Sequence, residues 1–445
     1  MVWVDRARRG VPRRDSAGKR QAIMDAALRL FVDIGYERTR VGDICDASGF
    51  STGSVYHFFG SKAEIAAELC AFAARDWADA VSAPLRDAPT AETAIRGYVH
   101  AFFHWVRAHG ALYNFINDHR VEAAASEAMR EIARAHAGVD RLLAERLAAE
   151  AAAGIVRTLP TPISRALLDG PCTCQLIRWA RNREDLADTA EEVATAAWHA
   201  LAADRAPAVD RIHPIFGRTI PGKVDAALVE RMGRAGARGA QTRERILAVS
   251  MTCFGEAGFE RTSILDIARR SEIAVGTIYH HFGSKDGIAA AWCLEGWRDW
   301  HGTLQRAIQA ERDPRAVVRG MALGLFEWAR VNVDLYSFIY DLRRVVIARP
   351  RVGAFEAVRL QTVRALQAAM AGPIARGEVR RMSSQALMAV INGMSLGYLI
   401  PWSLRRDDWG DAPEVIAEAI WRAVDSASPV ATRGAPAEHA ISKAS

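Results

Sequence analysis

Hydrogen-bond donors recur at matched spacing in two short segments of this 445-residue sequence. Each segment holds a threonine, then a tyrosine next to a histidine, and then a lysine near the start of a further predicted helix. The donors are Thr39, Tyr56, His57 and Lys62 in the first segment, and Thr262, Tyr279, His280, His281 and Lys285 in the second. Donors grouped on a small helical module suit the phosphates and base edges of duplex DNA. We therefore expect two nucleic-acid-binding modules.

Apolar periodicity and turn residues predict the helices that position these donors. In the first segment, apolar residues from Ile23 to Ile34 fall on one helical face, and Gly35 stands where a left-handed cap ends a helix. A short helix, a turn at 48–50 and a second short helix over 51–58 follow, and the second segment repeats them with a turn at 271–273 and a helix over 274–281. Two short helices joined by a tight turn form a helix-turn-helix, whose second helix enters the major groove.

The starts of these short helices differ between the two segments. A capping box begins at Ser263 in the second segment. The first segment has Arg40 at that position, so Thr39 is expected to cap its helix instead. Ser61 and Ser284 are expected to cap the helix that follows each helix-turn-helix.

The sequence repeats itself at a constant shift of 223 residues, which takes Gly35 to Gly258. Outside the donor segments the same shift takes Trp105 to Trp328, and further matches continue to Trp198 and Trp421. A constant shift over so long a span indicates that a whole unit is duplicated, rather than one motif.

The repeat divides the chain into two units joined by a linker rich in proline, glycine and arginine. We find no convincing strand pattern, so we expect an all-α fold in which each unit has a three-helix head and a helical-bundle body. The expected divisions are head one 18–66, body one 67–204, linker 205–239, head two 240–289, body two 290–427 and a disordered tail 428–445. A short helix is expected within the linker near 224–232.

Composition favours a cytoplasmic protein of bacterial type. The formal net charge of +6 permits a nucleic-acid partner, and arginines and lysines crowd the residues before each head. Six thinly scattered cysteines do not suggest a disulfide scaffold, and we interpret Cys172 and Cys174 as structural because no partner pair has metal-site spacing. We expect no metal, no cofactor, no signal peptide and no membrane span, since no apolar run approaches the roughly 20 residues that a span needs.

At this point the sequence resembles the TetR/AcrR family of repressors. The first segment has Gly-Tyr-x-x-Thr, then Asp-Ile, then Gly-Ser-Val-Tyr-His-Phe-Phe-Gly-Ser-Lys, which ends at Lys62. The second has Gly-Phe-x-x-Thr, Asp-Ile-Ala and Gly-Thr-Ile-Tyr-His-His-Phe-Gly-Ser-Lys, which ends at Lys285. The bodies resemble the family only in length and helical character.

The resemblance implies a DNA-binding head and a body that binds a ligand and dimerises. Family members usually bind a palindromic operator as homodimers and release it when a small molecule enters the body. By motif match, the contacts to the DNA backbone are Tyr56, His57 and Lys62. The base-facing start of the recognition helix is Thr52, Gly53 and Ser54, with Val275, Gly276 and Thr277 as counterparts in the second unit.

The two heads depart from each other in their DNA-facing residues. His281 stands where the first unit has Phe58, which leaves one phosphate contact in doubt there. The first recognition helix begins with hydroxyl groups, whereas the second begins with Ala274 and Val275, whose methyl groups suit a thymine methyl. We therefore predict an operator with two unlike half-sites.

Two units in one chain could serve one two-fold DNA site. A flexible linker of about 35 residues spans roughly 30–35 Å on average, which allows the bodies to pair within one molecule. We expect an intramolecular pseudo-dimer through a four-helix bundle, and we leave open a further homodimer of whole chains. The bundle helices are expected near 164–179, 191–201, 385–399 and 414–424.

Aromatic and polar residues of the bodies are interpreted either as plain core or as an effector pocket. The candidate pocket residues are His100, His104, Trp105, Tyr113, Asn117, Trp328 and Tyr336. Polar groups among aromatic rings are typical of ligand cavities. The first unit has more of these polar groups, so it is the better candidate for the body that binds an effector.

Two other classes of function compete with a ligand-released repressor. An enzyme is not expected, because the sequence has no nucleophile elbow, no phosphate-binding or dinucleotide glycine motif and no metal-binding histidine pair, and hence no catalytic residues. A scaffold in which one or both heads have lost DNA binding stays open, because the second recognition helix is less polar.

Overall fold

The computed structural model describes residues 16–36, 38–118, 127–182, 187–203, 238–259, 261–333, 335–336 and 352–426. Within these ranges the chain forms α helices and no strand, apart from two isolated bridges, Val156–Ala202 and Val379–Asp425. The all-α prediction is confirmed. The expected linker helix, the basic N-terminal run and the disordered tail lie outside the described residues.

The first unit begins with three helices that form its head, α1 (Ser16–Asp33), α2 (Val41–Ser48) and α3 (Thr52–Phe58). Its body follows as α4 (Lys62–Asp87), α5 (Ala91–Ala108), α6 (Gly110–Asp118), α7 (Glu127–Ala152), α8 (Thr161–Asn182) and α9 (Ala187–Leu201). The expected boundary between head and body, at 66 and 67, falls inside α4. One continuous helix therefore belongs to both parts.

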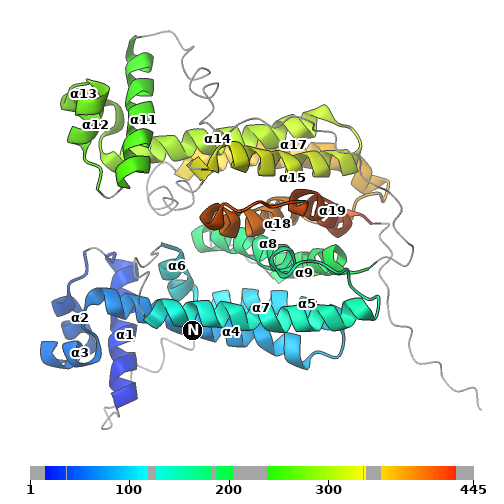
Figure 1. Cartoon of the computed structure of the whole chain (residues 1–445), viewed down its shortest axis with the longest axis horizontal. Coiled ribbons are helices and arrows are strands. Elements are labelled where there is room, and N and C mark those ends of the chain that lie inside the picture. The colour runs from blue at the N-terminus through cyan, green and yellow to red at the C-terminus, as the bar shows by residue number, and fades with distance from the viewer. Residues whose placement is uncertain are drawn as a thin grey trace, which may run out of the picture.

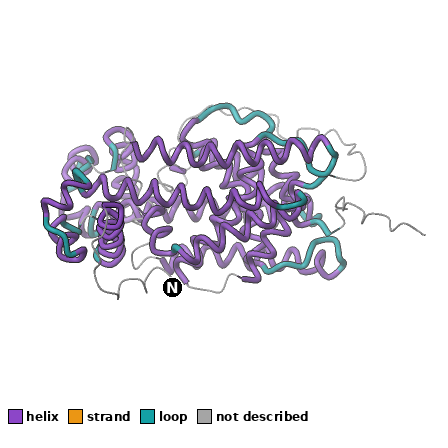
Figure 2. The backbone as a smooth tube through the Cα atoms, turned by 90° about the horizontal axis from the view of Figure 1, so that it is seen from below, coloured by secondary structure: helices purple, strands orange, loops and turns teal. Residues whose placement is uncertain are grey.

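The second unit repeats this order. Its head has α11 (Arg238–Ala257), α12 (Ile264–Ser271) and α13 (Val275–Phe282), and its body has α14 (Lys285–Ala310), α15 (Pro314–Val331), α17 (Val352–Ala375), α18 (Ser384–Arg405) and α19 (Ala412–Val424). The expected boundary at 289 and 290 again falls inside a helix, α14. Both heads lie at the same end of the elongated molecule, as Figure 1 and the turned view in Figure 2 show.

Local chemistry explains where the head helices begin and end. Gly35 has a positive φ of 93°, which glycine tolerates and which ends the helical run after α1. Ser61 and Ser284 accept hydrogen bonds from backbone amides of the first turn, as expected of caps. Ser263 and Asp266 form the expected capping box.

The cap of α2 differs from the sequence expectation. Arg40, rather than Thr39, holds the N-cap position, and its side chain makes no capping hydrogen bond. The backbone amide of Arg40 donates to the carboxylate of Asp43 at 2.7 Å, so only one half of a capping box is present. A guanidinium group has no acceptor, which is why the other half cannot form.

The apolar core is continuous through both units. In each body the long helix after the head, α4 or α14, packs against two others, α5 with α7 and α15 with α17. The single largest core cluster joins buried residues of both units, from Ile23 to Val424. Burial of apolar surface on this scale is the main term that holds the units as one body.

The two units meet where α8 packs along α18, with α9 along α19. The backbones come very close at Gly170, where an added Cβ would lie 1.9 Å from the carbonyl oxygen of Gly393. Gly397 is similarly tight against Ala166. No side chain larger than glycine fits at such a crossing without displacement of a helix.

Polar contacts also cross this seam. Arg422 donates to the carbonyl oxygen of Ala202 at 2.6 Å, and both the amide and the hydroxyl of Ser383 donate to the carboxylate of Glu192 at 2.6 Å. One stretch of α18, Ser384–Ser403, is uncharged and long enough to cross a membrane, which corrects the sequence-based statement about run length. It is 72% buried inside the protein, as expected of a core helix.

Candidate nucleic-acid interface

The first recognition helix, α3, presents polar groups on its outer face. Ser51 accepts a hydrogen bond from the amide of Ser54 at 3.3 Å, which fixes the start of the helix. Val55 is buried and anchors the helix on the head, whereas Tyr56 is 51% exposed. Thr52, Gly53 and His57 are exposed as well. These residues are therefore available to a groove, as the sequence predicts.

The second recognition helix, α13, has the same anchoring but a different outer face. Ile278 and Phe282 are buried, and Tyr279 is 50% exposed. Ala274 at the N-cap makes no side-chain hydrogen bond, unlike Ser51. The predicted residues His280 and Gly276 are exposed, and Val275, Thr277 and His281 are half-buried.

The two threonines are less accessible than the other predicted donors, and their contact with DNA stays a prediction. Thr39 and Thr262 are buried, and their hydroxyls donate to the carbonyl oxygens of Gly35 and Gly258 at 2.9 and 2.8 Å. Thr262 also reaches the carbonyl oxygen of Cys253 at 3.1 Å. These hydroxyls stabilise the loop after the first helix of each head.

The two lysines are turned toward their own heads. The ammonium of Lys62 donates to the carbonyl oxygens of Tyr36 at 2.7 Å and Thr39 at 3.0 Å and lies 4.3 Å from the centre of the Tyr36 ring. Lys285 repeats this with the carbonyl oxygen and ring of Phe259. Each lysine therefore joins the start of the long body helix to the loop, and its contact with a DNA phosphate stays a prediction.

Two arginines from the basic stretches of the sequence lie beside the recognition helices, a position that the sequence alone did not single out. Arg20 lies 4.8 Å from the centre of the Phe59 ring, and Arg243 lies 5.4 Å from that of Phe282. Both arginines and both rings are related by the same 223-residue shift. That register is the signal that distinguishes these cations from the surrounding basic residues.

The comparisons with known proteins find the same two segments. A family profile described as bacterial regulatory proteins, tetR family, matches residues 23–69 and 246–292. The regulator BetI of Burkholderia cenocepacia (strain HI2424) is 27% identical over 158 residues, which cover 35% of this chain and 80% of that protein. BetI of Burkholderia ambifaria (strain MC40-6) is 31% identical over 94 residues, 21% of this chain and 48% of that protein.

The chain is a TetR-family transcriptional regulator. It carries the DNA-binding domain of the family twice, and TetR-family regulators are not enzymes. Among solved structures, a TetR-family regulator of Marinobacter aquaeolei VT8 is 21% identical with a TM-score of 0.35 and covers 42% of this chain and 96% of that one. FadR of Bacillus subtilis in complex with stearoyl-CoA is 19% identical with a TM-score of 0.35 and covers 40% and 96%.

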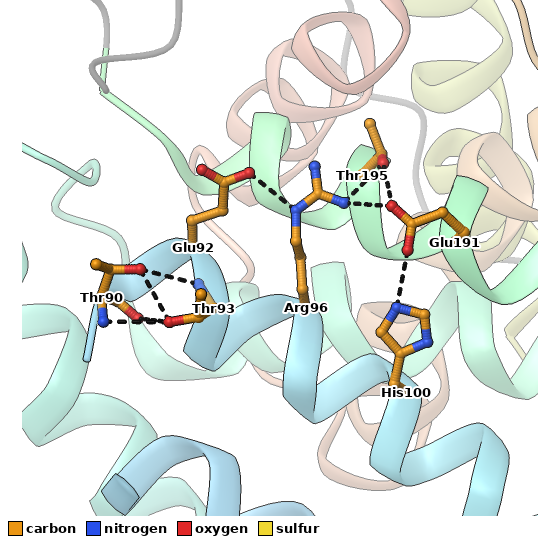
Figure 3. A network of polar contacts seen from close by, with 7 residues as sticks. All are labelled: Thr90, Glu92, Thr93, Arg96, His100, Glu191 and Thr195. Carbon is orange, nitrogen blue, oxygen red and sulfur yellow. Dashed lines mark hydrogen bonds and ion pairs between the residues drawn. The ribbon is translucent and has the colours of Figure 1, made fainter. Parts of the chain in front are cut away.

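The polar residues predicted for an effector pocket have different surroundings in this TetR-family chain. His104 is exposed on α5, and His100 faces α9, where it pairs with Glu191 at 2.9 Å (Figure 3). The side chain of Asn117 lies outside the described residues.

The aromatic members of that set are core residues. Trp105, Tyr113, Trp328 and Tyr336 are buried. The indole nitrogens of the two tryptophans donate to Asp76 and Asp299 at 2.7 Å each. None of the seven predicted residues lines the cavity of about 560 Å³ between the two units. The core interpretation agrees with this burial, and a pocket at these residues stays a prediction.

The cysteines agree with a structural role. Cys172 is buried, and burial raises the pKa of its thiol well above the ordinary value, so the reactive thiolate is disfavoured. In the part of the chain that the structure describes, no three residues of the metal-ligating types gather into a site.

Proposed function

We propose that this regulator is a repressor whose two heads bind one operator as an intramolecular pseudo-dimer. The observation that carries the proposal is the crossing of α8 and α18, where Gly170 meets its own counterpart Gly393. Equivalent residues meet each other on a two-fold axis. A two-fold arrangement of bodies, with both heads at one end of the molecule, suits the two half-sites of an operator.

The proposal includes release of the operator by a small molecule that binds the bodies. The support is that α4 and α14 each run from the head into the body without a break. A ligand that favours one arrangement of the bodies shifts both heads through these helices. The division into heads, bodies and linker is part of this proposal, as is action in the cytoplasm, where bacterial DNA lies.

The operator is proposed to have two unlike half-sites. The first recognition helix exposes Thr52 next to the capping hydroxyl of Ser51, whereas the second presents Ala274 and Val275. Hydroxyl groups can pair with either donors or acceptors on base edges, while methyl groups favour contact with thymine methyls. A binding-site selection with the full chain is expected to return an asymmetric consensus. A perfect palindrome contradicts this part of the proposal.

A gel shift on the promoter region of the chain's own gene tests the proposal as a whole. Binding is expected at low salt and is expected to weaken steeply at higher salt, because phosphate contacts release counterions. Light scattering is expected to give one chain, 48.7 kDa, for the free protein, and one chain plus one duplex for the complex. Masses of two chains contradict the intramolecular pairing, and no binding to any duplex favours a scaffold with inactive heads.

A further inference from the structure

A cavity of about 560 Å³ opens at the seam between the two units. The first unit lines it with Asp140 and Arg141 of α7 and with Arg165 of α8, and the second unit lines it with Tyr398 and Arg405 of α18. A volume of this size suits a small organic molecule. Because both units supply walls, a molecule in this cavity would contact both at once.

A partly buried ion network forms the floor of the cavity, with Asp169 more buried than Asp140. The guanidinium of Arg165, whose side chain is 14% exposed, donates to Asp169 at 2.6 and 2.9 Å and to Asp140 at 2.6 Å. The fully buried hydroxyl of Tyr98 donates to the other oxygen of Asp169. Arg165 thus neutralises one of the two aspartate charges, and the network keeps a net charge of −1.

The duplicated unit shows that the fold does not need this network. The 223-residue shift takes Tyr98, Asp140, Arg165 and Asp169 to Met321, Val363, Met388 and Asn392. Desolvated ion pairs are often no more stabilising than apolar residues of similar size. A partly buried charged network that is present in one unit only, and that lies beside a cavity, is therefore better explained by ligand binding than by stability.

Arg141 and Arg405 also line the cavity, so its three arginines and two aspartates sum to a charge of +1 when His136 is neutral. Burial and the nearby Arg165 lower the pKa of His136, so this ring is neutral near pH 7. Arg141 at the rim is exposed, and Arg405 pairs with the exposed Asp407 at 3.0 Å. Exposed pairs of this kind are weak and exchange readily. Two guanidinium groups, one from each unit, are thus available to an anion.

We propose that this cavity binds a small organic carboxylate, held by Arg141 and Arg405, with its apolar part against Tyr398 and Pro401. Arginine forks match a carboxylate, and the ring and the proline supply an apolar wall. The ligand joins the two units across their seam. Its regulatory consequence rests on the proposed function: a molecule that bridges α7 and α18 selects one angle between the bodies, and hence one spacing of the heads.

Calorimetric titration of the full chain with three ligands that share one ring tests the charge of the site. The probes are benzoate, benzamide and benzylamine at pH 7, which are anionic, neutral and cationic. We expect benzoate to bind and the other two to bind at least about tenfold more weakly, the loss expected when a charged hydrogen bond is not made. No benzoate binding, or equal binding of benzylamine, overturns the proposal.

Substitutions of the two arginines test whether the ligand binds at this site. Arg141→Gln and Arg405→Gln are each expected to weaken benzoate binding about tenfold or more. The control is Arg364→Gln, because the 223-residue shift takes Arg141 to Arg364, and its affinity is expected to equal that of the unmodified chain. Melting temperatures without ligand verify that all three variants fold. Unchanged affinity in both seam variants, or an equal loss in the control, overturns the site.

A separate gel shift without benzoate distinguishes the two proposals. A chain that binds benzoate at the seam but no duplex refutes the proposed function and leaves the cavity assignment intact. A chain that binds its operator but not benzoate refutes the cavity assignment and leaves the proposed function intact. Binding of both, with benzoate lowering operator affinity, supports the two proposals together.

Discussion

Lys62 and its counterpart Lys285 place a charged amine inside each head. Lys62 closes the loop between α1 and α2 onto the start of α4 through two carbonyl oxygens and the Tyr36 ring. The lysine that the family motif assigns to DNA therefore also stabilises the head. Its removal alters the shape of the head as well as the charge that faces a phosphate.

We expect Lys62→Met to lower the free energy of unfolding of the first unit by about 2 kcal/mol or more, since a hydrogen bond from a charged donor contributes about 1.5–3 kcal/mol. Operator affinity is expected to fall as well. Denaturant titration measures the first effect and a gel shift the second. Lys19→Met, on an exposed position of α1, is the control for stability. An unchanged unfolding midpoint in the Lys62 variant would show that its internal contacts do not form.

His301 makes the second body sensitive to acid. It is fully buried between α14 and α17, where its Nδ1 lies 3.0 Å from the hydroxyl of Thr362. Burial, and then the charge of Arg359, lower the pKa of His301 to about 3 from an ordinary value of 6.5, against a smaller opposite effect of Glu356. The folded chain therefore binds fewer protons here than the unfolded chain.

The sign of the pH dependence follows from this difference. The stability that neutral His301 contributes is complete above pH 6.5 and is lost as the pH falls toward 3. The loss is at most about 1.4 kcal/mol per pH unit for one group. Melting temperatures between pH 7 and 4 are expected to fall less steeply in His301→Gln than in the unmodified chain. Parallel curves would contradict the assignment.

At the scale of single helices, α2 and α12 are equivalent helices of the two units, but their N-termini are capped differently. Ser263 completes a capping box on α12, whereas Arg40 leaves α2 with the carboxylate half alone. The second unit thus shows that serine is the better N-cap residue for the equivalent helix of the first unit. A substitution that copies the second unit into the first tests whether the cap limits the stability of α2.

We expect Arg40→Ser to stabilise α2 by about 1 kcal/mol, the usual worth of a side-chain N-cap. Hydrogen exchange of the α2 amides measures this locally, and slower exchange is the expected result. The reciprocal change, Ser263→Arg, is expected to speed exchange in α12 by a similar factor. Faster exchange in α2 of the Arg40 variant would be evidence against the capping argument.

Elements were predictable from the sequence where local residues decide them. Gly35, Ser61 and Ser284 fix helix ends by their own conformations and hydroxyls, and the structure confirms each of them. The inward turn of Lys62 was not predictable, because its partners are backbone carbonyls, which no sequence pattern marks. The seam cavity was not predictable either, because Arg141 and Arg405 are far apart in sequence and each reads as an ordinary exposed charge.

At the scale of the whole molecule, the contact between Gly170 and Gly393 controls how closely the units approach. A Cβ at Gly170 would lie 1.9 Å from a backbone oxygen that cannot move away alone. Any larger residue must therefore separate α8 from α18. The heads lie at the ends of the same bodies, so their spacing changes with this crossing.

Gly170→Ala is expected to lower both the melting temperature and the operator affinity, although Gly170 is remote from the heads. Gly138→Ala in α7 is the matched control, because an added Cβ there meets nothing within 4 Å. Replacement of an ordinary helical glycine by alanine stabilises the protein by about 0.5–1 kcal/mol. The control is therefore expected to melt at an equal or higher temperature. Full operator affinity in Gly170→Ala would show that the spacing of the heads does not depend on the crossing of α8 and α18.

The hydrogen bonds between Glu192 and Ser383 have no mirror image, since the corresponding residues on the other side are Val415 and Pro160. In an association of identical subunits, a mutation at the interface occurs twice and must be tolerated on both sides. Here a mutation alters one side only, and the other side keeps the ancestral arrangement. Fusion of the two units in one gene thus allows each unit to change separately. One unit can acquire a binding site while the equivalent surface of the other unit remains an ordinary packing surface.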